Sequence, residues 1–500
     1  MASRPSRRHF LKTSTALTAG AAVVGGLAIS QSAHAAGSDE IKVALVGCGG
    51  RGSGAIRDRA QVGDNYKVVA VADAFEDGVK RAANSLRNEA QDEDNKLFGK
   101  VDLPDDRVFA GLDSYKKAID CLNPGDSVIL ASPPGFRPYH YRAAVEKGLH
   151  VFMEKPVCVD APGFRHVMET NRMADEKNLK VCGGYCFRYD AKYEHWIDQI
   201  HAGKIGDLQY TRGYYNTAPI GSKPRNPGEG ELEYQVRNWY QFVWTCGENI
   251  VEQHCHRIDV ANWIHGKGDR MAHPKEANGM GGRLVRSGRE DLLRQAPLFA
   301  DRKEWDEWYQ QYKSQFNRHG QAWDSFFVEY TYADGSRSYS QCRHIKNVWN
   351  HNMDYVHGTA GTGIAVPQRS SALLGPDGAE IWKDTGNFPK GMYLWEHDKH
   401  VEAIREDKPM NDGYSAAMSS MMAVLGREAA YSGKVMQWDE LVEKGRSYFP
   451  NGEILGFDQP APVQPDADGF YESSVPVPGV YNPFVSEGTG RAGGRTRARS

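Results

Sequence analysis

A lysine and a histidine that lie far apart in the chain have side chains suited to chemistry on a hydroxyl group. Lys155 belongs to Glu154-Lys155-Pro156, which follows the apolar run 150–153. A lysine at the end of a strand can donate to a substrate hydroxyl and hold positive charge beside a developing alkoxide. His256 has an unperturbed pKa of about 6.5, so it can take the hydroxyl proton. The pair indicates acid–base catalysis, but the residue types fit equally well a surface ion pair between Lys155 and Glu154.

Two carboxylates accompany the histidine in a stretch that predicts a helix over 250–264. Glu252 lies four residues before His256 on the same helix face, and Asp259 lies three residues after it. A carboxylate beside an imidazole can fix its tautomer and raise its basicity. A purely structural histidine–carboxylate pair is the alternative. The run His254-Cys255-His256 could suggest a metal site, but residues one or two apart point to different helix faces, so we expect no metal.

A glycine-rich turn follows the apolar, β-branched run 41–46 and predicts a dinucleotide site. Its glycines fall as Gly47-x-Gly49-x-x-Gly52. Gly47 allows a sharp turn, Gly49 lets a pyrophosphate approach the backbone, and Gly52 lets the next helix pack on the strand. The free N–H groups at the start of that helix, around Gly50 and Arg51, would face the phosphates. A tight turn that binds nothing is the alternative.

An acidic residue and two further loops complete the predicted cofactor site. Asp73 ends the strand 68–72, where a carboxylate can accept hydrogen bonds from the adenosine ribose. It would repel a 2′-phosphate, so NAD is favoured over NADP, although Arg51 leaves NADP possible. Ser132-Pro133 ends the strand 127–131 at the sheet edge where ligands bind, as Glu154 and Lys155 do after their own strand.

The alternation of strands and helices predicts how these residues are positioned. Residues 40–183 should form a parallel sheet with helices on both faces. Residues 184–435 should form a second α/β domain with a mainly antiparallel sheet, because a hairpin is predicted around Asp334-Gly335. Within this domain, residues 217–238 read as a loop, residues 265–325 as an insertion and residues 394–432 as one long helix.

Composition and the two ends of the chain limit the function further. The 500 residues carry a formal charge of −3, which gives no reason to expect nucleic acid or a membrane surface as partner. Eight scattered cysteines without a CxxC pair argue against a disulfide framework. Residues 1–36 have a twin-arginine motif (Ser6-Arg-Arg-His-Phe-Leu-Lys12), an apolar stretch and a cleavage site, so we expect export to the periplasm rather than a membrane anchor. Residues 436–500 predict an extended tail with a disordered, Arg/Gly-rich end.

Together, these motifs resemble the glucose–fructose oxidoreductase / inositol dehydrogenase (Gfo/Idh/MocA) family. The match covers roughly residues 41–265 and 326–433, and it is carried by the glycine motif, by Glu154-Lys155-Pro156 and by the Glu252, His256 and Asp259 pattern. The resemblance implies a Rossmann domain followed by an α/β domain whose large open sheet mediates homodimers or homotetramers. It also implies NAD(P)-dependent oxidation of a sugar or cyclitol hydroxyl.

The resemblance also assigns roles to single residues. Lys155 would contact the nicotinamide and the reacting hydroxyl, and His256 would be the acid/base. Glu252 stands where the family usually has aspartate. Arg137 falls near a usual histidine and, with Arg188, is a candidate substrate contact.

Three functions remain open from the sequence. The first is a dehydrogenase that keeps its cofactor tightly bound, because free NAD is scarce outside the cytoplasm. The second is a glycosidase that uses transient oxidation without net redox change. The third is a sugar-binding protein without catalysis.

Overall fold

The computed structural model describes residues 40–63, 65–286, 288–450 and 452–484. The predicted signal peptide and the Arg/Gly-rich end lie outside these ranges. The described residues lie within one compact unit, which contains two sheets. Within the described part of the chain, no helix is long and apolar enough to span a bilayer.

The first sheet has six parallel strands in the order β3-β2-β1-β4-β5-β6, as the fold class predicted. The order reverses between β1 and β4, and ligands bind in such sheets outside the carboxyl ends of the strands at this switch point. The strands are β1 (Ile41–Val46), β2 (Tyr66–Asp73), β3 (Val108–Ala110), β4 (Ser127–Leu130), β5 (His150–Met153) and β6 (Val181–Gly183). The helices are α1 (Gly50–Ala60), α2 (Glu76–Glu89), α3 (Ser114–Asp120), α4 (Arg137–Lys147) and α5 (Ala161–Glu176), with short turns η2 (Asp105–Arg107) and η3 (Cys186–Tyr189).

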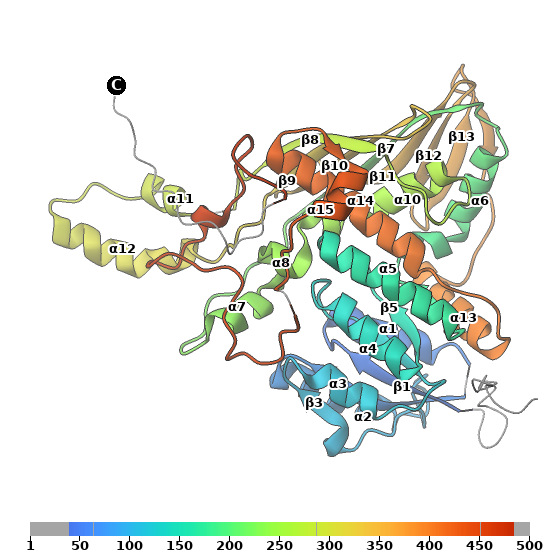
Figure 1. The fold of residues 1–500 in the computed structure, drawn as a ribbon, viewed down its shortest axis with the longest axis horizontal. Coiled ribbons are helices and arrows are strands. Elements are labelled where there is room, and N and C mark those ends of the chain that lie inside the picture. The colour runs from blue at the N-terminus through green and yellow to red at the C-terminus, as the bar shows by residue number, and fades with distance from the viewer. Residues whose placement is uncertain (1–39, 64, 287, 451, 485–500) are drawn as a thin grey trace, which may run out of the picture. The chain divides into compact units, whose positions relative to one another are not determined.

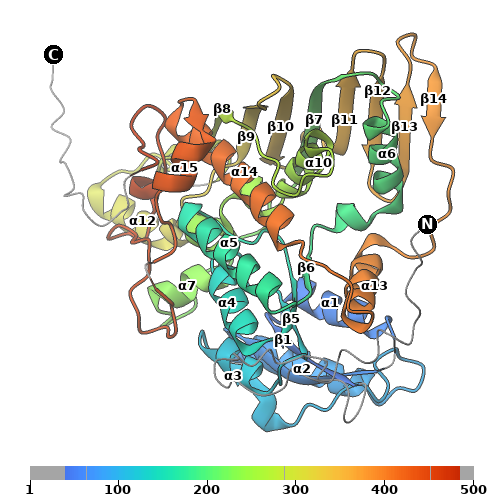
Figure 2. The ribbon, with the colours of Figure 1, turned by 45° about the vertical axis from the view of Figure 1, so that its right-hand side comes forward.

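The second sheet has nine strands in the order β14-β13-β12-β11-β7-β10-β9-β8-β15. Only the β10–β7 pair is parallel among its described pairings, so the prediction of a mainly antiparallel sheet is confirmed. The helices α6 (Ala191–His201), α10 (Cys255–Gly266) and α14 (Gly413–Ser432) lie against one face of it (Figure 2). The strands are β7 (Leu208–Thr217), β8 (Glu276–Gly282), β9 (Ser325–Thr331), β10 (Arg337–His344), β11 (His351–Gly358), β12 (Thr362–Val366), β13 (Ser370–Leu374), β14 (Glu380–Lys383) and β15 (Met436–Gln437).

The first half of the molecule is residues 40–183 with the first sheet, and the second half is residues 184–484 with the second sheet. Three predicted elements of the second half differ in the structure. The helix predicted over 394–432 is two helices, α13 (Met392–Arg405) and α14, because Pro409 lies between them and cannot continue a helix. The helix predicted over 250–264 is also two, α9 (Asn249–Glu252) and α10. The loop predicted over 217–238 contains the helix α7 (Glu231–Arg237).

The insertion and the tail also have structure of their own. The insertion carries β8 and the helices α11 (Arg289–Arg294) and α12 (Arg302–Phe316), which project from the sheets (Figure 1). The tail is not simply extended, because it begins with β15 and α15 (Trp438–Lys444). It then runs first to α3 and afterwards past α7 (red in Figure 1), with a short turn η5 (Glu472–Ser474).

Helix α14 joins the two halves of the molecule. All of its residues are buried. It contacts α5 and β6 of the first half and β8 and β9 of the second. One apolar cluster therefore runs from Val46 and Leu130 in the first sheet, through Leu425 of α14, to Val328 in the second sheet. This continuous core fixes the ends of the first sheet relative to the helices of the second half.

Candidate active site

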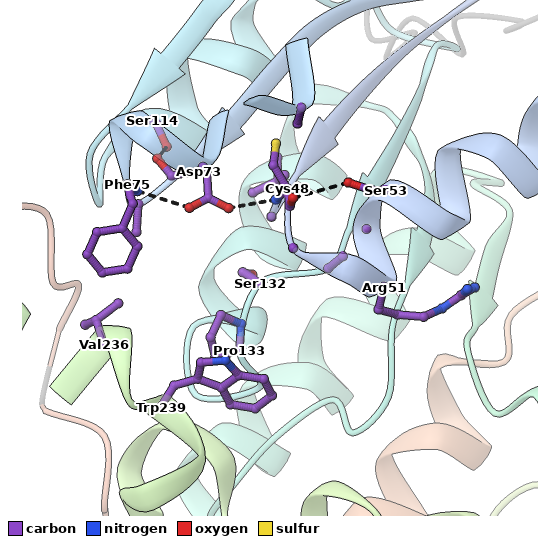
Figure 3. Close-up of a pocket in the computed structure, with 18 of the residues that line it drawn as sticks. Cys48, Arg51, Ser53, Asp73, Phe75, Ser114, Ser132, Pro133, Val236 and Trp239 are labelled. Carbon is purple, nitrogen blue, oxygen red and sulfur yellow. Dashed lines mark hydrogen bonds between the residues drawn. The ribbon is translucent and has the colours of Figure 1, made fainter. Parts of the chain in front are cut away.

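A cavity of about 700 Å³ opens at the switch point of the first sheet (Figure 3). The glycine turn, Asp73, Ser132 and Pro133 line it, so the structure brings these predicted cofactor residues together. Segments that the sequence did not connect with the cofactor line it too. They are Phe75, Leu112, Tyr115, Phe136 and His140 of the first half, and Lys223, Val236, Arg237 and Trp239 of the second.

The glycines of the turn have the different roles that their spacing predicts. Gly47 has a φ of +96°, and a Cβ there would lie 2.5 Å from the Ala131 backbone. A Cβ on Gly52 would lie 1.9 Å from the carbonyl oxygen of Gly47, so only glycine lets α1 pack this closely. A Cβ on Gly49 or Gly50 would meet no atom within 4 Å. This open backbone at the N-terminus of α1 fits a pyrophosphate group.

Asp73 is held at the end of β2 by backbone donors. The N–H of Cys48 lies 2.7 Å from Oδ2, and the N–H of Phe75 lies 3.0 Å from Oδ1. Burial raises the pKa of Asp73, and these two hydrogen bonds work in the opposite direction. The carboxylate is therefore fixed in the cavity with lone pairs left for a ligand's hydroxyl groups.

Arg51 lies in the glycine turn but points away from Asp73 (Figure 3). Its guanidinium donates to Glu154, contacts Glu396 of α13 at 3.3 Å and lies 4.4 Å from the ring centre of Tyr393. Arg51 thus links the cofactor turn to the Glu154-Lys155-Pro156 segment and to α13. Its charge is already engaged by carboxylates.

The Lys155 ammonium lies at the neighbouring strand end and joins the two halves. Leu130 and Met153 are register partners in β4 and β5, and Ser132 and Lys155 lie two residues beyond them. The Lys155 Nζ donates to the backbone carbonyl of Glu252 and lies 3.3 Å from its Oε1. Burial alone lowers the pKa of Lys155, but the negative charge of Glu252, together with smaller contributions from other groups such as Glu154, outweighs burial, so the pKa is raised. Lys155 is therefore an ammonium group at neutral pH and cannot serve as the base.

The His256 imidazole lies on α10 above the end of the first sheet. Its ring centre is 4.8 Å from that of Phe187 and 6.2 Å from that of Tyr185. Burial lowers the pKa of His256 well below its usual value, and the charges of Lys155 and Arg257 lower it further. The imidazole is therefore neutral at pH 7. Its buried Nδ1 has no hydrogen-bond partner among the described residues, so the ring is not held by a carboxylate.

The two carboxylates predicted to assist His256 have other partners, so the expectation of raised basicity is wrong. Glu252 binds Lys155 through Oε1 and accepts from the Tyr240 hydroxyl through Oε2, at 2.5 Å. Asp259 forms a two-pronged ion pair with Arg188 at 2.8–3.1 Å and accepts from Ser419 at 2.7 Å. The break in the helix at residues 253–254 separates Glu252 from the face of His256.

The two arginines expected to contact substrate differ in their surroundings. Arg137 is 2% exposed and donates to the backbone carbonyls of Ser132 and Pro156. It clamps two strand ends together, and burial lowers its pKa to about 10. This position corrects the expectation of a substrate contact, because the buried side chain has no open path to a ligand. Arg188 is partly exposed while paired with Asp259, and its guanidinium lies 5.3 Å from the ring centre of Trp263.

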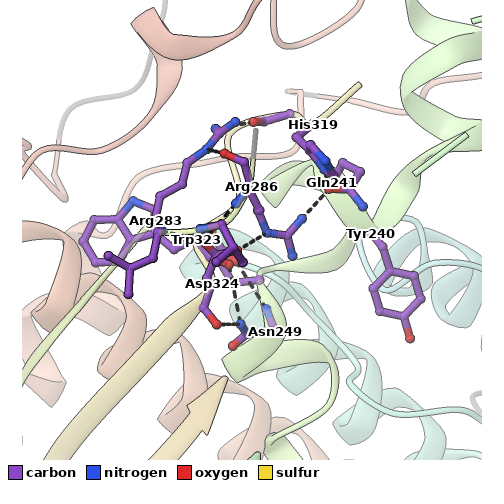
Figure 4. A network of polar contacts seen from close by, with 12 residues as sticks. Tyr240, Gln241, Asn249, Arg283, Arg286, His319, Trp323 and Asp324 are labelled. Atoms are coloured by element: carbon purple, nitrogen blue, oxygen red, sulfur yellow. Dashed lines mark hydrogen bonds and ion pairs between the residues drawn. The ribbon is translucent and has the colours of Figure 1, made fainter. Parts of the chain in front are cut away.

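A polar network that the sequence did not reveal supports the segment that carries Tyr240 (Figure 4). Arg286, at the start of the insertion, donates to the side chain of Gln241 and lies 3.3 Å from the Asp324 carboxylate. His319 lies 3.2 Å from the same Gln241 oxygen. The sequence did offer one signal that this segment is buried. Residues 234–244 are rich in aromatic side chains, which is unusual in an exposed loop.

Glu248 is a second residue that the sequence did not single out. It has φ +91° and ψ 168°, a conformation almost confined to glycine, immediately before α9. Its buried carboxylate accepts from the Trp323 N–H at 2.7 Å and from the Tyr431 hydroxyl. These contacts hold the backbone that leads to Glu252. No group of His, Cys, Asp and Glu side chains in the described ranges is arranged to hold a metal ion.

Comparison with known proteins identifies the family of residues 41–185. Residues 41–185 match the family described as "Oxidoreductase family, NAD-binding Rossmann fold" (GFO_IDH_MocA). Residues 41–185 belong to this family. The inferred Gfo/Idh/MocA resemblance is thereby confirmed for residues 41–185, whereas the matched family model does not extend to residues 186–265 or 326–433, for which the resemblance was also expected. Residues 4–24 match the twin-arginine translocation signal, which supports export by that route.

Several curated relatives of the chain are inositol 2-dehydrogenases. Inositol 2-dehydrogenase of Corynebacterium glutamicum (strain R) is 27% identical over 141 residues, which are 28% of this chain and 35% of that protein. The similarity therefore spans about a third of that relative.

Solved structures share the fold over most of the chain. Scyllo-inositol dehydrogenase from Lactobacillus casei, with NAD(H) and scyllo-inositol bound, has a TM-score of 0.52 at 18% identity and covers 80% of this chain and 99% of its own. Aldose-aldose oxidoreductase from Caulobacter crescentus has a TM-score of 0.55 at 16% identity over the same shares. A fifth of this chain thus has no counterpart in either structure.

Two glycines of the Gfo/Idh/MocA turn offer a matched test of the cavity. Gly52→Ala forces a Cβ against the Gly47 carbonyl and should destabilise the protein by about 1–3 kcal/mol. Gly49→Ala meets open space and should cost less than about 1 kcal/mol, yet weaken NAD binding about tenfold by blocking the approach of the pyrophosphate. Urea unfolding and calorimetric titration with NAD measure the two effects. Unchanged NAD affinity in Gly49→Ala would show that the dinucleotide does not bind here.

Proposed function

We propose that this protein is an NAD-dependent oxidoreductase that acts on a hydroxyl group of a sugar or cyclitol. The observation that carries the proposal is that a lysine and a histidine lie at neighbouring strand ends of the Rossmann sheet: Lys155 follows β5, and the His256 ring centre lies 6.2 Å from that of Tyr185, which follows β6. Lys155 is held as an ammonium group by Glu252, and its charge in turn helps to keep His256 unprotonated. Oxidation of an alcohol requires both a proton acceptor and a positive charge beside the oxygen.

The cavity residues fit a dinucleotide. Gly49 and Gly50 would face the pyrophosphate, Asp73 would accept from the adenosine ribose, and Ser132 and Pro133 would lead towards the nicotinamide beside Lys155. When bound, NAD supplies the hydride acceptor. The protein's own residues place the substrate hydroxyl, take its proton at His256 and stabilise its oxygen with Lys155.

NAD is favoured over NADP because the fixed Asp73 carboxylate would repel a 2′-phosphate. Arg51, which left this choice open in the sequence, points to Glu154 and Glu396 instead. Three arginines that line the cavity are also engaged: Arg57 with Glu89, Arg81 with Asp77 and Arg237 with Glu229. A sugar or cyclitol substrate agrees with the relatives' activities, and the twin-arginine signal agrees with a periplasmic destination.

The first test is an activity assay. With a panel of sugars and inositols, His256→Ala and Lys155→Ala should each lower kcat/KM for NAD reduction by about 10²–10⁴. His195→Ala, which removes a half-exposed histidine paired with Asp384, should leave it unchanged. Equal rates in the wild type and all three variants would show that neither His256 nor Lys155 takes part in catalysis, and a wild-type protein without activity on any substrate of the panel would support a non-catalytic binding protein. Hydrolysis of a chromogenic glycoside without added NAD would support a glycosidase that uses transient oxidation.

The pH dependence tests the state of His256. A base with a lowered pKa stays unprotonated as the pH falls through 6.5, the ordinary value for histidine. The acidic limb of log kcat/KM should therefore lie below pH 6.5. An acidic limb at or above pH 6.5 would show that His256 is not in the environment described here, or that another group is the base.

The open face of the nine-stranded sheet supports a homo-oligomer. Met280 and Phe327 are register partners on the face opposite the helices and are 70% and 43% exposed. A second copy of the chain would cover such apolar residues. Phe327→Arg should therefore reduce the mass measured by light scattering, whereas Leu298→Arg, at a fully exposed position on the insertion, should not. A monomeric wild-type protein would contradict the proposal.

A further inference from the structure

The outer wall of the cofactor cavity is built from segments that the dinucleotide-binding fold does not supply. Four aromatic residues of the first half line it: Phe75, Tyr115, Phe136 and His140. Phe75, Tyr115 and Phe136 contact residues of the tail. The His140 ring stacks on that of Tyr115. The cavity wall nearest Asp73 is therefore supported by α7 and the tail, which lie about 100 residues or more further along the sequence.

Phe75, two residues beyond Asp73, is held by two partners. The guanidinium of Arg237, the last residue of α7, lies 4.1 Å from its ring centre, and the Phe457 ring of the tail stacks on it at 5.6 Å. Glu229 and Glu233 bind Arg237 at 2.7 and 3.0 Å and fix its direction. Phe75 thus has a defined orientation only while α7 and the tail are both in place.

Tyr115 and Phe136 also contact the tail directly. The Tyr115 hydroxyl donates to Glu453 at 2.7 Å, while its ring stacks on His140 at 3.9 Å. Phe449 packs edge-on against Phe136 at 5.3 Å. The Asp160 carboxylate accepts from the Phe449 N–H at 3.1 Å and anchors this part of the tail to the start of α5.

Helix α7 and the tail are also bound to each other. Tyr471 donates to Glu231 at 2.6 Å, and Gln235 donates to the carbonyl of Val463. A single apolar cluster contains Leu232 and Val236 of α7, several buried tail residues, and Leu112 and Phe136 of the cavity wall. The two segments therefore act as one cover.

We propose that α7 and the tail residues Phe449, Glu453, Phe457, Val463 and Tyr471 form a clamp on the adenosine end of the dinucleotide site. This inference rests on the proposed function. The clamp keeps the dinucleotide bound between turnovers, because release requires the contacts to Phe75 and Tyr115 to open. Retention suits an exported enzyme, since the cofactor loaded before export can then be reduced by the hydroxyl of one substrate and reoxidised by the carbonyl group of a second substrate, which takes up the hydride and a proton.

The test measures dissociation of the dinucleotide. Wild-type protein should carry NAD(H) through purification and release it slowly when excess apo-protein or an NAD-consuming enzyme traps the free cofactor. Phe457→Ala should raise the dissociation rate constant about three- to tenfold, and the double variant with Glu453→Gln should raise it further. Phe457→Tyr keeps the ring and should restore slow release.

Leu455→Ala is the matched control, because Leu455 lies in the same stretch and is 39% exposed. It should change neither the dissociation rate nor the melting temperature. Equal dissociation rates for wild type, Phe457→Ala and the double variant would overturn the clamp, as would rapid release from a wild-type protein that oxidises sugars with added NAD. A wild-type protein that binds no dinucleotide at all would instead overturn the proposed function.

Discussion

The ion pair between Lys155 and Glu252 is the interaction on which the rest of the site depends. It joins the end of a strand in the first sheet to a helix in the second half, and both side chains are largely buried. Removing such charges from water costs several kcal/mol per ion, and the cost is repaid only if the geometry is good. Here the ammonium group meets both the carboxylate and the backbone carbonyl of Glu252. The relative position of β5 and α9 is therefore restricted by two contacts to one atom.

Helix α14 supplies the support that such a contact needs. Its Ser420 accepts from the Val157 N–H, two residues beyond Lys155, and bonds the Tyr185 hydroxyl next to His256. Its Ser419 binds Asp259, which holds Arg188. Its Tyr431 binds Glu248, whose strained backbone leads into α9. One fully buried helix thus contacts every segment that carries a proposed catalytic residue, and these contacts fix the segments relative to one another.

The parts of the site that the sequence predicted correctly are those with local causes. A tight turn at Gly47 and close packing at Gly52 follow from the backbone over a few residues, and the boundaries of β1 were predicted residue by residue. The side-chain partners of Glu252, Asp259 and Arg137 were not predictable, because their helical spacing says nothing about residues such as Tyr240, Arg188 or Pro156 that approach from elsewhere. The break before α10 and the helix in 217–238 were missed for the same reason, since tertiary contacts decide both.

The glutamate at position 252 connects the proposed acid–base residues to the insertion. With one methylene more than aspartate, its carboxylate spans from Lys155 to the Tyr240 hydroxyl. Tyr240 is followed by Gln241, which is bound by Arg286 and His319 of the insertion. Glu252 thus receives donors from both Lys155 and Tyr240. Three contacts link the insertion to the proposed catalytic lysine: Arg286 to Gln241, Tyr240 to Glu252 and Glu252 to Lys155. A change in the packing of the insertion can therefore shift the position of Lys155 through Tyr240.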